Sequence, residues 1–176
     1  MRGVESAKAK IILYKCALYG VVLYLVGILQ VTFFAKINLI GASPDLLLAA
    51  ASTIALYEEG KTASICGIIS GFFYCALGGT SLPLYILFSF ICAYALHIAT
   101  ESGLPRKHSS FLAVTLLSFG AKALFNVAEL SLTAQSFNVF SAFWNTVLPE
   151  FVSSILFSPI PYIIFFGLTR IFNKKH

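Results

Sequence analysis

Apolar residues in this chain gather in six long stretches, separated by short segments rich in Pro, Gly, Lys and Glu. The stretches cover residues 11–35, 44–57, 62–77, 83–99, 109–132 and 147–171. Within them apolar and polar positions do not alternate with a period of two, which the strands of a membrane barrel require. The pattern therefore predicts six helices, and no connecting segment is long enough to form a second domain.

Composition indicates the environment of these helices. Hydrophobic residues make up 59% of the 176 positions and charged residues only 11%, whereas soluble domains carry about 25% charged residues. So little polar surface cannot cover a water-soluble globule, and we predict an all-α, multi-pass protein of the cell membrane. The first stretch is longer than the apolar core of a signal peptide, and no small-residue cleavage site follows it, so we expect a retained helix.

The basic residues predict the orientation of the helices. With the N-terminus in the cytoplasm, Lys36 is the only Lys or Arg residue in the predicted outer loops. The predicted cytoplasmic segments then carry Arg2, Lys8, Lys10, Lys61, Arg106, Lys107, Arg170, Lys174 and Lys175. Lys and Arg collect on the cytoplasmic side of membrane proteins, so six crossings with both termini inside are expected. The net charge of +5 is then explained by contact with anionic lipids, and no nucleic-acid partner is predicted.

The second stretch lies in the segment SPDLLLAAASTIALYEEG and is too short for an ordinary membrane span. A helix over residues 44–57 is about 21 Å long, against a hydrocarbon core of about 30 Å. We expect Ser43 as the N-cap, Pro44 as the first helical residue, and Asp45 as an acid facing the positive end of the helix dipole. The proline and the aspartate thus predict a helix start.

Two acids, Glu58 and Glu59, follow this helix at its C-terminal end, where they oppose the helix dipole. The simplest expectation is that both are solvated at the membrane boundary. The alternative is that Lys61 or the basic residues of a partner protein offset them.

The third stretch contains Gly67-x-x-x-Gly71. Small residues four positions apart let two helix backbones approach closely in a membrane. The motif predicts either a docking face for the helix of a partner or close packing inside the six-helix domain, and the spacing alone does not choose between them.

The fifth stretch carries polar side chains on one helical face. Lys122, Asn126 and Glu129 recur at i, i+4 and i+7, and Thr115 and Ser118 extend the same face. Ionisable residues inside a membrane span are costly unless they are paired, and they indicate a functional site by default. Lys122 and Glu129 are about 10 Å apart along the axis, so each is expected to find a partner on another helix.

Further polar residues are expected near the outer mouth of the domain. They are Asn38, Asp45, Glu129, Trp144, Asn145 and Glu150. Glu150 is a candidate partner for Lys122 if its side chain reaches inward. The group predicts a binding site for a small polar ligand, a contact for a partner protein, or an ordinary interfacial belt of Trp and acids. These alternatives stay open at this point.

Residues that could perform chemistry are scattered. The four cysteines, Cys16, Cys66, Cys75 and Cys92, all fall in apolar stretches without a C-x-x-C pair or a Cys/His cluster. The sequence contains no H-E-x-x-H, no G-x-S-x-G and no Gly-rich phosphate loop. We therefore predict no catalytic residue, metal or cofactor, and a protein that is not an enzyme.

Several short motifs resemble the MreD family of rod shape-determining membrane proteins. The resemblance includes the helix start PDLLL, the later GIISGF, and LVGILQVTFF with its glutamine near the outer end of the first helix. The matching positions are Pro44, Asp45, Leu46, Leu47, Gly60, Gly67, Gly71 and Gly79. The segment LPEFVSSILFSPIPYIIFFGLTRIF is similar to the last helix of the family, whereas Cys75 stands where the family often has an aspartate.

The resemblance implies a fold and a role. It implies a six-helix bundle similar to the substrate-binding subunits of energy-coupling-factor (ECF) transporters. It also implies a non-enzymatic scaffold in the elongation complex that builds peptidoglycan, paired with the bitopic protein MreC and linked indirectly to the cell-wall synthases and to MreB. The alternative is an ECF substrate subunit for a vitamin or micronutrient, but the first stretch lacks a clean Ala-x-x-x-Ala pair for docking a coupling subunit.

Overall fold

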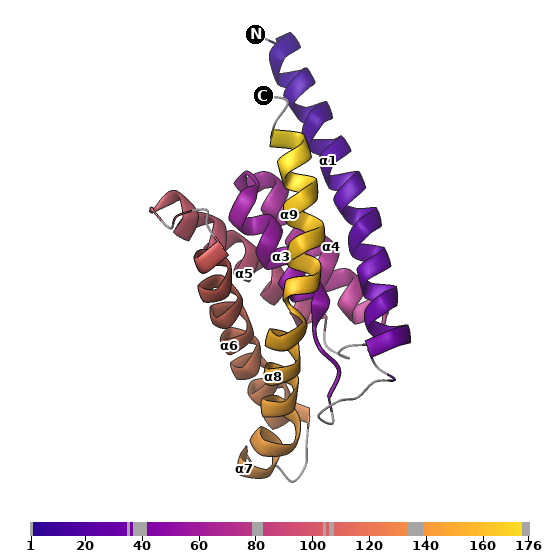
Figure 1. Cartoon of the computed structure of the whole chain (residues 1–176), viewed down its shortest axis with the longest axis vertical. Helices are drawn as coiled ribbons and strands as arrows, with labels where there is room; N and C mark the ends of the chain where they lie inside the picture. The colour runs from indigo at the N-terminus through magenta and orange to yellow at the C-terminus, as the bar shows by residue number, and fades with distance from the viewer. Residues whose placement is uncertain are drawn as a thin grey trace.

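The computed structural model describes residues 2–34, 36, 42–78, 83–103, 105, 108–133 and 139–173. In this part of the chain all regular structure is helical (Figure 1). The α-helices are α1 (Arg2–Leu29), α3 (Leu46–Tyr57), α4 (Gly60–Ala76), α5 (Leu84–Glu101), α6 (His108–Thr133), α7 (Val139–Ala142), α8 (Leu148–Phe157) and α9 (Pro159–Asn173). Two π-helical segments, η1 (Gln30–Phe34) and η2 (Phe143–Val147), continue α1 and precede α8. The prediction of an all-helical chain is confirmed.

Helix α3 is the centre of the fold. It contacts α1, α4, α5, α6, α8 and α9, and 11 of its 12 residues are buried. A helix that is apolar on all sides is stable only when other elements surround it, and the run LLLAAASTIALY meets this condition. The charged side chains described below meet at Asp45, next to the N-terminal end of α3.

The start of α3 differs from the expected one. The N-cap is Asp45, whose side chain accepts a hydrogen bond from the backbone N–H of Leu48 at 3.0 Å, and the helix begins at Leu46. The assignment of Ser43 as the N-cap and of Pro44 as the first helical residue is therefore wrong by two positions. The side chain of Asp45 does not only face the dipole of α3: it also caps the helix directly.

The last predicted helix, 147–171, is broken in the structure. Segments 143–157 and 159–171 are inclined by 44° to each other. The break falls at Ser158, next to Pro159 and Pro161. Proline cannot donate a backbone hydrogen bond and clashes with the preceding turn, so the carbonyls of Ile155 and Phe157 lose their usual helical donors. The N–H and the hydroxyl of Ser158 instead both bond to the Ile155 carbonyl oxygen.

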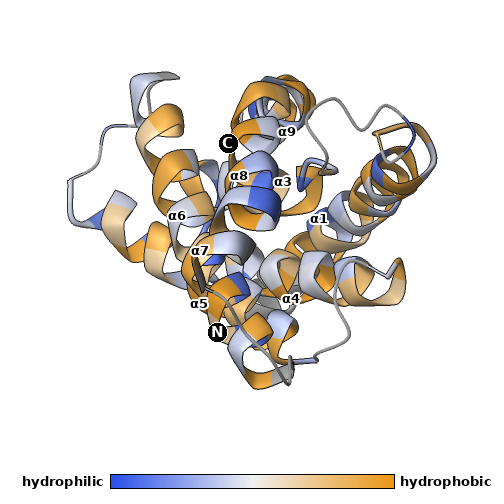
Figure 2. Ribbon diagram, turned by 90° about the horizontal axis from the view of Figure 1, so that it is seen from below, coloured by the Kyte–Doolittle hydropathy of each residue, from blue (hydrophilic) through white to orange (hydrophobic). Residues whose placement is uncertain are grey.

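Hydrophobic residues occur along the helices throughout the bundle (Figure 2), and many of them are exposed. Leu124, Leu132 and Leu13, for example, are 75%, 77% and 71% exposed. By length and composition three described helical segments, Lys10–Phe34, Leu84–Glu101 and Ser109–Leu132, are able to cross a membrane, and the bent pair raises the number to four. The start of α1 and the end of α9 lie at the same end of the molecule (Figure 1).

The Gly67-x-x-x-Gly71 face of α4 packs against α5. A Cβ atom on Gly67 would lie 2.7 Å from Ala93 Cβ, and one on Gly71 would lie 2.8 Å from Ile86 Cα. Two glycines thus allow close contact between these backbones. Of the two predicted roles, internal packing is the one seen, because α5 already occupies the face on which a partner helix was expected.

The simplest expectation, that Glu58 is solvated at the membrane boundary, is wrong. Its side chain is only 2% exposed; it accepts a hydrogen bond from Tyr19 at 2.7 Å and pairs with Lys15 at 2.8 Å. Its neighbour Glu59 is exposed as expected. The partner that offsets the buried acid is therefore a lysine of α1, and neither Lys61 nor a second protein is needed.

Glu58→Gln is expected to lower the free energy of unfolding by about 1–3 kcal/mol, since it removes the charge of the buried carboxylate that pairs with Lys15 at 2.8 Å. The matched control is Glu59→Gln, an exposed neighbour, which is expected to stay within about 0.5 kcal/mol of the wild type. Unfolding of the purified protein by SDS titration in mixed micelles measures both. Equal effects of the two substitutions would contradict the structural distinction between the acids.

Candidate functional site

Asp45 and the first turn of α3 are held by side chains from two other parts of the chain. Its backbone N–H donates to Ser154 Oγ of α8 at 2.9 Å. The Oε1 atom of Gln30, in η1, accepts hydrogen bonds from the next two backbone N–H groups, those of Leu46 at 2.9 Å and Leu47 at 3.3 Å. The first N–H groups of a helix have no partner inside it, and here side chains supply the partners. The carboxylate of Asp45 is thereby fixed in the protein interior.

Lys122 of α6 reaches this carboxylate. Its Nζ atom lies 2.5 Å from Asp45 Oδ2, 2.6 Å from Glu150 Oε1 and 2.9 Å from the hydroxyl oxygen of Tyr74. The ammonium group has three protons to donate, and three acceptors surround it. Lys122 is only 2% exposed and Asp45 1%, so this is a buried ion pair with an added carboxylate.

Two tyrosines complete the surroundings of the ammonium group. Tyr74 and Tyr85 stack with their ring centroids 4.2 Å apart. Lys122 Nζ lies 4.3 Å from the centroid of the Tyr74 ring and 5.4 Å from that of Tyr85, which adds cation–π attraction. The hydroxyl of Tyr85 donates to Asp45 Oδ2 at 2.5 Å.

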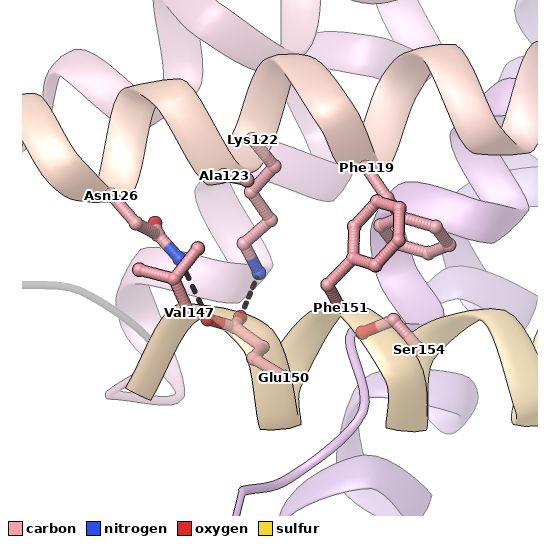
Figure 3. Close-up of a pocket in the computed structure, with 8 residues that line it drawn as sticks. All are labelled: Phe119, Lys122, Ala123, Asn126, Val147, Glu150, Phe151 and Ser154. Atoms are coloured by element: carbon pink, nitrogen blue, oxygen red, sulfur yellow. Dashed lines mark hydrogen bonds and ion pairs between the residues drawn. The ribbon is translucent and has the colours of Figure 1, made fainter. Parts of the chain in front are cut away.

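Glu150 links α8 to α6 through Lys122 and Asn126. Asn126 Nδ2 donates to Glu150 Oε2 at 2.6 Å, one turn along α6 from Lys122. Figure 3 shows Lys122 and Asn126 pointing from α6 to the same carboxylate of α8. The cavity beside them has a volume of about 10 Å³, which is room for no more than a single water molecule. We call Asp45, Tyr74, Tyr85, Lys122, Asn126 and Glu150 the Lys122 cluster.

The Lys122 cluster contains one more negative charge than positive charge when both carboxylates are ionised. Burying such charges is costly unless every group is paired and hydrogen-bonded. Here neutral donors compensate the extra negative charge: the Tyr85 hydroxyl and the Leu48 N–H donate to Asp45, and the Asn126 amide donates to Glu150. The positive end of the α3 dipole also faces Asp45. The cluster thus ties α3, α4, α5, α6 and α8 together at one point.

Several predicted site residues belong to the Lys122 cluster and others do not. Glu150, the candidate partner of Lys122 if its side chain reached inward, does reach Lys122, and Asn126 also bonds to it, a contact that was not predicted. Glu129 is half-buried further along α6, about 10 Å along the axis from Lys122. Trp144 is 53% exposed and contacts Phe140 and Phe143.

The remaining predicted polar positions lie apart from the cluster. Asn145 of η2 is exposed and donates to Ser141 of α7, four residues earlier. Ser118 bonds to Val114 and Ser52, and the hydroxyl of Thr115 is buried without a partner among the described residues. Gly60 faces the ring of His97. Asn38 and Gly79 lie outside the residues that the structure describes.

Sequence reasoning missed four members of the site and its support: Tyr74, Tyr85, Gln30 and Ser154. It also assigned Asp45 to the helix dipole and not to Lys122, which is 77 positions away. A usable signal existed, because a lysine inside an apolar stretch requires a buried acid, and Asp45 is the acid directly joined to the most apolar helix. Tyrosines, in contrast, are too common in apolar stretches to be selected from sequence.

The chemistry available to this arrangement is limited. All three protons of Lys122 are directed to acceptors, and both carboxylates are hydrogen-bonded. Among the described residues no group of three or more His, Cys, Asp or Glu side chains could hold a metal ion. A second cavity, of about 220 Å³, lies between η1 and the end of α4, lined by Gln30, Ser43 and Tyr74. The cluster is built to join helices.

A central buried helix, an internal ion pair and apolar outer faces are consistent with an integral membrane protein of the all-helical class. The comparisons with known proteins add no narrower assignment: no protein-family model, no curated protein and no solved structure matches the chain significantly.

Proposed function

We propose that the protein is a non-enzymatic membrane scaffold of the bacterial rod complex, resembling MreD and pairing with an MreC-like bitopic protein. The observation that supports this proposal is the placement of the residues behind the resemblance. Asp45 caps the central helix, Gln30 binds the first turn of the same helix, and Gly67 and Gly71 seat α5 against α4. The residues of the shared motifs thus hold the helices of this fold together, which is what membership of the family would require.

The proposed topology has six crossings with both termini in the cytoplasm. The short α3 is compatible with it, because α3 is covered by protein on all sides and its polar ends need not match the lipid. The common location of the start of α1 and the end of α9 (Figure 1) is also compatible with an even number of crossings. The nine basic residues of the predicted cytoplasmic segments support a cytoplasmic location for both termini.

A scaffold is supported over the alternative of an ECF substrate subunit by the size of the cavity beside the Lys122 cluster. The cavity next to Tyr74 and Gln30 is about 220 Å³, below the range of roughly 300–1,000 Å³ of small-molecule sites. The ammonium group of Lys122 has no proton left for a ligand. A thermal-shift screen against vitamins would oppose the scaffold proposal if one of them gave saturable stabilisation.

Depleting the protein is expected to make rod-shaped host cells lose their shape, and a tagged copy is expected to recover an MreC-like protein from solubilised membranes. Binding of the partner should weaken when the Lys122 cluster is disturbed. The Asp45→Asn variant is therefore expected to recover at least threefold less of that partner. Glu59→Gln, which alters an exposed acid at the other end of α3, about four helical turns from Asp45, serves as the control and should recover the wild-type amount. Rods that persist after depletion, or wild-type protein that recovers no such partner, would overturn the proposal.

A further inference from the structure

Helices α5 and α6 enclose a groove that nothing in the Lys122 cluster uses. They lie on the same side of the bundle (Figure 2), and a cavity of about 300 Å³ separates them. Its walls include Phe88, Cys92, Ala95 and Ala99 of α5 and Leu117 and Ala121 of α6. The small side chains Ala95, Ala99 and Ala121 leave the space open, so the groove is a direct result of residue size.

The groove is apolar and lies at membrane depth. Both of its walls belong to segments able to span a membrane, Leu84–Glu101 and Ser109–Leu132. No charged side chain lines it, and its one hydroxyl, that of Ser118, already donates to the Val114 carbonyl and accepts from Ser52. A polar ligand would therefore find no free partner there, and water would be held poorly.

The shape of the groove selects its occupant. From Phe88 to Ala99 the groove follows α5 for about 16 Å, so its whole empty volume of about 680 Å³, open space beside it included, corresponds to a mean cross-section of about 42 Å². An α-helix with side chains is about 10–12 Å wide and has a cross-section of roughly 80–110 Å², which is about twice too large to enter the groove. An extended hydrocarbon chain has the required width.

One end of the groove is closed by aromatic packing. Phe88 of α5 stacks on Phe125 of α6 with ring centroids 4.9 Å apart, and this stack separates the groove from Tyr85 and the Lys122 cluster behind it. A chain that enters from the side of Ala99 would therefore end against Phe88. The groove is therefore closed at its Phe88 end and open along its length to the surroundings.

We propose that this groove binds one acyl chain of a bilayer phospholipid, laid between α5 and α6. The proposal rests on the membrane location proposed above but not on the scaffold role. A bound chain fills the space that the alanines leave and gives the two helices apolar contacts beyond the Phe88–Phe125 stack. The lipid then acts as a fixed part of the fold.

The first test fills the groove from inside the chain. Ala95→Phe places an aromatic ring in the open space, and native mass spectrometry after delipidation measures the phospholipid that remains bound. Wild-type protein is expected to retain one phospholipid per chain, and Ala95→Phe at least threefold less. Ala128→Phe, an equally exposed alanine on α6 outside the groove, is the matched control and should retain the wild-type amount. Equal retention in Ala95→Phe and wild type overturns the proposal, as does a free fatty acid in place of an intact phospholipid.

The second test uses the unaltered protein, so it does not depend on the folding of a variant. A phosphatidylcholine with a photoreactive group in the middle of one chain is incorporated into nanodiscs, and the labelled residues are mapped after irradiation. Adducts on Cys92, Ala95 and Ala121 are expected to exceed those on Leu13 and Val21 of the exposed face of α1 at least threefold.

The outcomes of this second test distinguish the two proposals. Equal labelling of the groove and α1 overturns the bound chain but leaves the membrane location intact. Labelling of neither face overturns the membrane location, and the acyl-chain site with it.

Discussion

Lys122→Ala is expected to lower the free energy of unfolding by about 3–5 kcal/mol, the usual cost of removing one partner from a buried ion pair. Lys122 bridges the carboxylates of Asp45 and Glu150 at 2.5 and 2.6 Å, so without the ammonium group the two negative charges would face each other in a largely buried place. Unfolding by SDS titration in mixed micelles measures the loss. The same variant should recover less of any partner that requires the folded bundle.

Two controls separate the charge from the loss of a lysine. Lys10→Ala removes an exposed lysine of α1 and is expected to change stability by no more than about 0.5 kcal/mol. The triple variant Lys122→Met, Asp45→Asn, Glu150→Gln removes all three charges together and is expected to be more stable than Lys122→Ala, since no unpaired charge stays buried. A Lys122→Ala protein as stable as the wild type would show that the Lys122 cluster contributes nothing to the fold.

Gly71→Ala is the second substitution with a large expected effect, a loss of about 1–3 kcal/mol from overpacking. A Cβ at this position would lie 2.8 Å from Ile86 Cα and 3.3 Å from the carbonyl oxygen of Tyr85. Both are backbone atoms of α5, so relief requires the whole helix to move. Because the Tyr85 hydroxyl binds Asp45, a displaced α5 would also disturb the Lys122 cluster.

A matched glycine is available for comparison. Gly120 lies in α6, and a Cβ there would meet nothing within 4 Å. Gly120→Ala is expected to raise stability by up to about 1 kcal/mol, which is the difference in helix propensity between the two residues. Measurement of both variants under the same conditions tests the packing directly. If Gly71→Ala were as favourable as Gly120→Ala, the close approach of α4 and α5 would be wrong.

Hydropathy and composition predicted the helical class and most of the helix boundaries because both depend on local runs of apolar residues. The helices over 62–77, 83–99 and 109–132 begin and end within two residues of α4, α5 and α6. Two helices were exceptions: α1 begins at Arg2, nine residues before the predicted start at residue 11, and the last helix was predicted as continuous although Pro159 and Pro161 lie within it. In this case the apolar run was given more weight than the missing backbone donors.

The sequence alone also determined that Lys122 required a partner, because an ammonium group in an apolar helix is unstable without one. Only the tertiary structure decided which acids those partners are, since Asp45 lies 77 positions away and is brought close by the packing of α6 on α3. The same holds for Glu58, whose burial depends on Lys15 and Tyr19 of another helix. Hydropathy is a property of a segment, whereas the pairing of charges depends on distances between segments, and those distances arise only when the helices pack.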